Sequence, residues 1–182
     1  TAEGGKTETD FYYENSIADY VAEVAGGDAF TSIQTVTGSA AGRDREDRPE
    51  YKVLMNASFC FSNKVQMLEY YHNSSFLEHG GSPERAVKTA FVNQIDAYLR
   101  QKGLYKKDES RITFTDVQDC LVYISSSFST ITSYENQTKK AITNRFIAQA
   151  MTEFLKQRLE VYFIERPEEA QKIAQQVLVN KQ

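Results

Sequence analysis

The residues with the clearest chemical potential lie in a polar loop just ahead of the longest expected helix. Gln137, Thr138 and Lys139 follow a β-type segment and precede a helical pattern that begins at residue 142. A lysine placed there can present its ammonium group, a compact point charge, to a phosphate, and the glutamine can add a neutral donor. Movement of the lysine would then push the helix behind it. The alternative is an ordinary exposed loop lysine.

Other candidate groups favour structural roles. His72 and His79 lie across an expected turn without a Cys or Asp at ligand spacing, so we expect surface or core histidines rather than metal ligands. The serines at 125–129 lack a Gly-x-Ser-x-Gly elbow, which favours a strand with buried hydroxyls. The chain has neither a Gly-x-Gly-x-x-Gly nor a Walker-type loop, so it carries no phosphate cradle of its own.

Aromatic and thiol side chains also fit packing roles. Tyr70 and Tyr71 fall in an expected strand, where packing against neighbouring strands is favoured over stacking on nucleic-acid bases. Cys60 and Cys120 each sit in an apolar run, far apart in the chain. We expect both to be buried free thiols of a reducing compartment.

Composition indicates one globular domain. The chain has 182 residues, with 21 basic and 25 acidic side chains and a net charge of −4. This composition excludes collagen-like, disordered and disulfide-scaffold classes. No apolar run approaches the ~20 residues that a membrane helix needs, and the acidic, polar start does not resemble a signal peptide. The charge is uneven: residues 1–50 are acidic and residues 139–182 mildly basic, which suits either a polyanion or a solvated helix face.

The first half of the chain reads as one helix and three strands. A helix capped by Asn15 or Ser16 should end at Gly26-Gly27. Residues 30–38 are β-branched and predict a strand, and the small and charged residues from 39 to 49 predict a mobile loop. Residues 50–61 and 64–72 predict a hairpin joined by a two-residue turn.

The second half is mainly helical. Ser82 is expected to cap a helix with Pro83 in its first turn, and that helix should stop at Gly103. Residues 113–116 resemble a capping box that leads into a strand near 119–128. A polar loop over 130–141, a long helix over 142–165 and a short helix after Pro167 complete an α+β domain.

Four segments, in order, are similar to one known family. The stretch from Tyr134 to Leu178 (YENQTKKAITNRF…ERPEEAQKIAQQVL) resembles the Gln-Thr-Lys loop, long helix and Pro break of DNA gyrase B and topoisomerase IV subunits. Residues 11–14 (FYYE), 72–82 (HNSSFLEHGGS) and 113–121 (TFTDVQDCL) are similar to three further family segments. Together they cover nearly the whole chain, which therefore looks like a divergent family member.

The chain departs from the family pattern at defined positions. Asn15-Ser16 replaces Gly-Gly, Pro83 replaces His, and Arg166 stands where Asn is usual. Residues 118–120 (QDC) replace Arg-Glu-Gly, and residues 130–132 (TIT) replace Pro-Asp-Pro. Gyrase, topoisomerase IV and a specialised paralogue all remain open as alternatives.

The resemblance implies a transducer domain of a type IIA topoisomerase. Its fold would be like the second domain of ribosomal protein S5: a four-stranded sheet with helices on one face and a left-handed βαβ crossover, against the usual right-handed rule. Residues 1–182 would form this single domain, with a leading segment and helix over 1–29. The S5-like core would span 30–141 and end in the Gln-Thr-Lys loop, followed by C-terminal helices over 142–182.

The resemblance also implies a function. Lys139 would be catalytic, pairing with the γ-phosphate of ATP in a neighbouring domain, and Gln137 would assist in binding that phosphate. ATP and Mg²⁺ would serve the full-length subunit, while the isolated chain would bind neither and be inactive. Partners would be DNA, an upstream ATP-binding domain, a downstream cleavage domain, a second copy of the subunit and a gyrase A-type or topoisomerase IV A-type subunit. The expected location is the bacterial cytoplasm, at the nucleoid and not in a membrane.

Two alternatives stand beside this interpretation. The middle domain of a related mismatch-repair or chaperone-like ATPase also sends a lysine to a nucleotide, but lacks the full series of loop, long helix and Pro. A stand-alone RNA-binding module on an S5-like fold would be expected to carry a basic patch, which the net charge of −4 does not favour.

Overall fold

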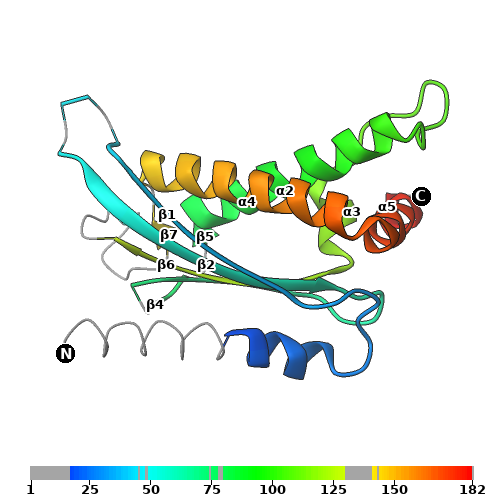
Figure 1. The fold of residues 1–182 in the computed structure, drawn as a ribbon, viewed down its shortest axis with the longest axis horizontal. Helices are drawn as coiled ribbons and strands as arrows, with labels where there is room; N and C mark the ends of the chain where they lie inside the picture. Colours follow the sequence, from blue (N-terminus) through cyan, green and yellow to red (C-terminus); the bar gives the residue numbers. More distant parts are fainter. Residues whose placement is uncertain are drawn as a thin grey trace.

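A mixed β-sheet with helices on both faces forms the body of the molecule (Figure 1). The computed structural model describes residues 17–44, 46–47, 49–73, 75–77, 80–129, 141–142 and 144–181. Two long helices, α2 (Ser82–Gln101) and α4 (Arg145–Glu165), cover one face. The N-terminal helix over residues 17–25 lies against the other face. The expected α+β class is confirmed, and both long helices lie on one face as expected. The expected four-stranded sheet with helices on one face differs from the structure in two respects: the sheet gains a fifth, two-residue strand, and the N-terminal helix packs on the other face.

The main sheet has the order β1-β2-β6-β3-β4. Its strands are β1 (Gln34–Gly42), β2 (Tyr51–Phe61), β3 (Met67–His72), the two-residue β4 (Ser75–Phe76) and β6 (Leu121–Ser129). Neighbours are antiparallel except β3 and β6, which run parallel and are joined through α2. A second, two-stranded parallel sheet pairs β5 (Gly80–Gly81) with β7 (Ala141–Ile142).

The expected hairpin between β2 and β3 is wrong. β2 is paired on one side with β1 and on the other with β6, so β3 joins the sheet beyond β6. The connection is also longer than a two-residue turn. The Ser62 hydroxyl accepts hydrogen bonds from the backbone N–H groups of Lys64 and Val65, which bends the chain away from β2.

The loop expected from residue 39 starts later than the sequence indicated. β1 runs to Gly42, and its inward positions alternate with exposed ones. Gly38, Ala40 and Gly42 occupy inward positions of β1. Ala40 and Gly42, which belonged to the expected mobile loop, are therefore part of a strand that packs against a helix. Side-chain size at these positions is set by tertiary packing, which overrides their low β propensity.

Helix ends are set partly by residues other than those expected. Ser82 is the first residue of α2 rather than its cap, because Gly81 occupies the cap position with a φ of 76° that a residue with a side chain adopts with difficulty. The capping box at Thr113 and Asp116 is confirmed, and it starts α3 (Phe114–Gln118). Pro167 begins α5 (Pro167–Lys181) as expected.

The core lies between the sheet and the helices α2 and α4. Phe59, Phe91, Tyr123 and Tyr162 meet edge to face, with Phe59 in contact with both Phe91 and Tyr162. A smaller cluster on the opposite face packs Ile17, Val21 and Ala25 of the N-terminal helix against β2 and β6. Cys60 and Cys120 are buried free thiols, as expected.

Candidate functional site

The loop that carries Gln137 and Lys139 lies outside the described residues, but both of its ends are described. It leaves β6 at Ser129 and returns at β7, which starts at Ala141. We call the groups that hold these two ends the loop base. It comprises the end of β3, the end of β6, β5, β7, and the start of α4 together with the β1–β2 connection.

The start of the loop is held by Asn73. The Ser129 backbone N–H donates to Asn73 Oδ1 at 3.0 Å, and Asn73 Nδ2 donates to the Ser129 carbonyl oxygen at 3.1 Å. This side-chain amide therefore extends the ladder between β3 and β6 by one step. Asn73 has a φ of 49°, in the left-handed region that asparagine tolerates better than most residues.

His72 holds the same end of β6 through two side-chain hydrogen bonds. Its Nδ1 lies 2.7 Å from the Ser127 hydroxyl and its Nε2 lies 3.1 Å from the Ser129 hydroxyl. The side chain is fully buried, and burial lowers the pKa of His72 to about 4. The imidazole is therefore neutral at pH 7 and acts as a hydrogen-bonding spacer between two serines. His72 is thus a core histidine, one of the two structural roles expected for it, and the buried hydroxyls expected in β6 are confirmed, whereas His79 lies outside the described residues.

The end of the loop is held by strand pairing and by Asn144. β7 pairs in parallel with β5, immediately before α2. The Ser82 hydroxyl then donates to the Asn144 carbonyl oxygen at 2.7 Å. Asn144 is 2 % exposed, although the next residue, Arg145, is exposed. The loop thus returns to the body of the domain at the first turn of α2.

Asp44 caps the start of α4 from the β1–β2 connection. Its Oδ1 accepts a hydrogen bond from the Phe146 backbone N–H at 3.0 Å, and its Oδ2 accepts one from Asn144 Nδ2 at 3.0 Å. Tyr51 donates to the same Oδ1 at 2.7 Å. Burial, together with this bond to Asp44, raises the pKa of Tyr51 well above its usual value, so the phenol remains a donor. The Asn144 side chain does not cap its own helix, and Asp44 takes that role.

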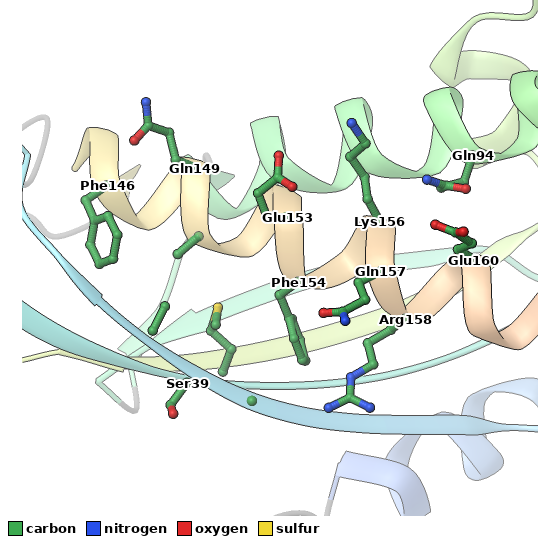
Figure 2. Close-up of a pocket in the computed structure, with 14 residues that line it drawn as sticks. Ser39, Gln94, Phe146, Gln149, Glu153, Phe154, Lys156, Gln157, Arg158 and Glu160 are labelled. Carbon is green, nitrogen blue, oxygen red and sulfur yellow. The ribbon is translucent and has the colours of Figure 1, made fainter.

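β1 then runs along the length of α4 (Figure 2). A Cβ on Gly38 would lie 2.7 Å from the Phe154 ring, and one on Gly42 would meet the Phe146 ring. Arg158 donates to the Thr37 carbonyl oxygen at 3.0 Å. A groove of about 770 Å³ opens between these contacts. Its charged lining residues are of both signs: Glu153, Lys156, Arg158 and Glu160.

The far end of α4 is tied to the segment that precedes β1. Glu169 of α5 accepts hydrogen bonds from the Tyr162 hydroxyl at 2.6 Å and from the Ser32 backbone N–H at 3.0 Å. Burial acts to raise the pKa of Glu169, but these hydrogen bonds lower it, so the carboxylate is charged. Both ends of α4 are therefore fixed to the flanks of a single strand, by Asp44 at one end and Ser32 at the other.

In the described part of the chain, the side chains of the loop base join strand ends and helix ends to one another. Among them, no three His, Cys, Asp or Glu side chains are close enough to share a metal ion. None of the helices in the described part of the chain is long and apolar enough to cross a membrane. What these residues provide is a fixed strand end at Ser129 and a fixed return at β7 and Asn144, on either side of residues 130–140.

Solved structures of gyrase and topoisomerase IV have a similar fold. The chain superposes on the 43K ATPase domain of Thermus thermophilus gyrase B with a TM-score of 0.74 and 19% identity, covering 88% of this chain and 41% of that one. It superposes on the topoisomerase IV ATP-binding domain of Francisella tularensis with a TM-score of 0.63 and 20% identity, covering 78% of this chain and 38% of that one. These likenesses establish the α+β fold class that resembles the second domain of ribosomal protein S5.

Sequence comparison then gives the family. Residues 16–182 match the family described as DNA gyrase B, so the chain belongs to that family. It is 26% identical over 171 residues to the DNA gyrase B protein of Mycoplasmoides gallisepticum, covering 92% of this chain and 26% of that protein. It is 24% identical over 182 residues to the DNA gyrase B protein of Chlamydia muridarum, covering 99% of this chain and 22% of that protein. The chain thus spans about a quarter of the length of these relatives.

Proposed function

We propose that this chain is the transducer domain of an ATP-dependent type II DNA topoisomerase subunit of the gyrase B type. In this proposal Lys139, assisted by Gln137, binds the γ-phosphate of ATP held by a neighbouring domain. Lys139 also acts in catalysis, because its charge stabilises the phosphoryl oxygens as the bond breaks. The domain couples ATP binding and hydrolysis to the passage of one DNA duplex through another.

The observation that carries the proposal is the anchoring of the loop base. The loop is fixed at Ser129 by Asn73 and His72, and at Asn144 by Ser82 and Asp44. A loop that is fixed at both ends and followed, after β7 and Asn144, by a 21-residue helix can pass a small displacement to that helix. At ~1.5 Å per residue, the helix would carry this displacement over roughly 30 Å.

The physical basis of the coupling is differential binding. A lysine gains a charge-assisted contact with ATP that ADP lacks once the γ-phosphate has gone. Only such a difference can shift the balance between two relative positions of the domains. The family's bistable element would then be the interface between the nucleotide-binding domain and this one.

The remaining parts of the proposal concern the whole subunit. An upstream ATP-binding domain supplies ATP and Mg²⁺, and a downstream domain cleaves DNA. A second copy of the subunit and a gyrase A-type or topoisomerase IV A-type partner complete the enzyme, which works in the bacterial cytoplasm. Membership of the gyrase B family favours this proposal over a mismatch-repair or chaperone-like ATPase and over an RNA-binding module.

Steady-state ATP hydrolysis by the full-length subunit tests the role of Lys139. Lys139→Ala should lower kcat about 10²-fold, because loss of one preorganised charge at a phosphoryl group typically costs ~3 kcal/mol. Lys140→Ala is the matched control, since it removes the adjacent positive charge and should keep normal turnover. If Lys140→Ala lost turnover and Lys139→Ala kept it, the lysine that contacts the phosphate would be Lys140. Normal turnover in both variants would remove the chemical basis of the proposal.

A further inference from the structure

Asp44 is placed to control the start of α4 from a distant part of the sequence. Its bond to the Phe146 N–H spans 102 residues, and its bond to Asn144 spans 100. Capping residues normally precede their own helix by one position, where the side chain reaches the N–H two or three residues on. Here Asn144 stands at that position, but its side chain turns to Asp44 instead.

The capping carboxylate is itself held in place. The Tyr51 hydroxyl donates to Asp44 Oδ1 and also accepts from Asn144 Nδ2 at 3.2 Å. Tyr51 is 5 % exposed, and its ring packs edge to face on Phe146, with ring centroids 5.5 Å apart. Tyr51 is the first residue of β2, so the β1–β2 connection cannot shift without disturbing the first turn of α4.

The same contacts reach the loop base. Asn144 binds Ser82 through its carbonyl oxygen and Asp44 through its side chain, and it lies five residues after Lys139. Asn144 is therefore the shared point at which α2, the β1–β2 connection and the end of the loop meet. The negative charge of Asp44 also interacts favourably with the partial positive charge of the helix dipole at the N-terminus of α4.

We propose that Asp44 is a positioning residue for the Gln-Thr-Lys loop. By capping α4 from the β1–β2 connection, it fixes the position of Asn144, five residues after Lys139, and thereby the point at which the segment that carries Lys139 joins α4. This inference rests on the proposed function of Lys139. It adds a second element, the β1–β2 connection, through which the position of the sensing lysine is set.

Full-length subunits carrying Asp44→Asn and Asp47→Asn provide the test. Asparagine at residue 44 lacks the negative charge. Its NH₂ group would also face one of the N–H or O–H donors that now bind the carboxylate, and it cannot accept that hydrogen bond. Asp47 lies three residues on in the same connection and is exposed, so Asp47→Asn makes the same chemical change as a control. Active sites are counted by nucleotide titration, so that a smaller folded fraction does not count as slower catalysis.

Asp44→Asn should lower kcat about tenfold, which corresponds to ~1.4 kcal/mol in the activation barrier. The affinity for ADP should stay unchanged, because ADP lacks the phosphate that Lys139 contacts. Asp44→Glu, which keeps the charge, should recover part of the rate. Asp47→Asn should match the unmodified subunit.

The double variant separates positioning from general stability. If Asp44 acts through Lys139, adding Asp44→Asn to Lys139→Ala should lower kcat no further. A tenfold loss that persists in the Lys139→Ala background, or equal rates for Asp44→Asn and Asp47→Asn, would overturn the inference while leaving the role of Lys139 intact. Normal turnover of Lys139→Ala alone would instead refute the proposed function, and this inference with it.

Discussion

His72 shows how a titratable residue can serve the site without taking part in chemistry. The imidazole is fully buried between Ser127 and Ser129, and it holds the strand end from which the loop departs. Burial lowers the pKa of His72 to about 4, against an ordinary value near 6.5 in the unfolded chain. The native state therefore resists protonation in a pH range where the unfolded state accepts a proton.

Stability should consequently fall as the pH is lowered through this window. Above pH ~6.5 His72 is neutral in both states and stability is complete, whereas between pH ~6.5 and about 4 only the unfolded state binds the proton. The loss should reach roughly 2–3 kcal/mol by about pH 4. Urea unfolding of the unmodified chain and of His72→Gln at pH 7, 5.5 and 4.5 measures it. The difference in the free energy of unfolding between the unmodified chain and His72→Gln should narrow as the pH falls. A difference that is the same at all three pH values would show that His72 does not titrate in this range.

Sequence reasoning at the residue level predicted the Gln-Thr-Lys loop, which lies outside the described residues, but it did not predict the residues that hold the strand and helix ends beside it. Gln137 and Lys139 stood out because of residue type and position before a long helix. Asp44 gave no signal, because a trans cap depends on which connection folds over a helix 100 residues away. Asn73 and Asn144 offered only the general preference of asparagine for turns and helix starts.

At the scale of elements, β1 and α4 behave as a matched pair. The inward-facing residues of β1 are small where aromatic rings of α4 pack against them, as Phe154 does against Gly38. Phe154 is 8 % exposed, so its ring has little room to move aside. The distance between strand and helix is therefore set by glycine.

Gly38→Ala should destabilise the domain by about 1–3 kcal/mol through overpacking. The added Cβ would lie 2.7 Å from the Phe154 ring, closer than side chains tolerate. Gly27→Ala is the control, because a Cβ there meets nothing within 4 Å and the φ of Gly27 is outside the left-handed region. Thermal melting should show a lower Tm for Gly38→Ala alone. Equal melting temperatures would mean that α4 lifts from β1 at little cost.

The elements were more predictable than their pairing. Apolar periodicity located both long helices, and the capping box of α3 followed from residues 113–116 alone. The prediction of a β2–β3 hairpin was wrong because it assumed that strands close in sequence pair with each other. In the structure β6, about 60 residues later, lies between β2 and β3. Local patterns do not encode which distant strand fills a gap in a sheet.

At the scale of the whole molecule, we expect that the isolated chain does not bind ATP. Its sequence has no phosphate cradle, and only the segment with Gln137 and Lys139 is proposed to contact a phosphate. Calorimetry of the isolated chain with a non-hydrolysable ATP analogue should therefore give no measurable heat of binding, while the same analogue should bind to the full-length protein. Micromolar binding by the isolated chain would show that it holds a nucleotide site of its own.

The central claim is that Lys139 distinguishes ATP from ADP, and a ratio of affinities tests it most directly. Calorimetry on full-length subunits gives Kd for a non-hydrolysable ATP analogue and for ADP, with and without Lys139→Ala. A lost charge-assisted contact of ~1.5–3 kcal/mol should weaken the analogue by about ten- to a hundredfold, while ADP binds as before. The preference for the triphosphate would then fall by the same factor. An unchanged preference in Lys139→Ala would contradict the account, because the γ-phosphate would then be sensed elsewhere.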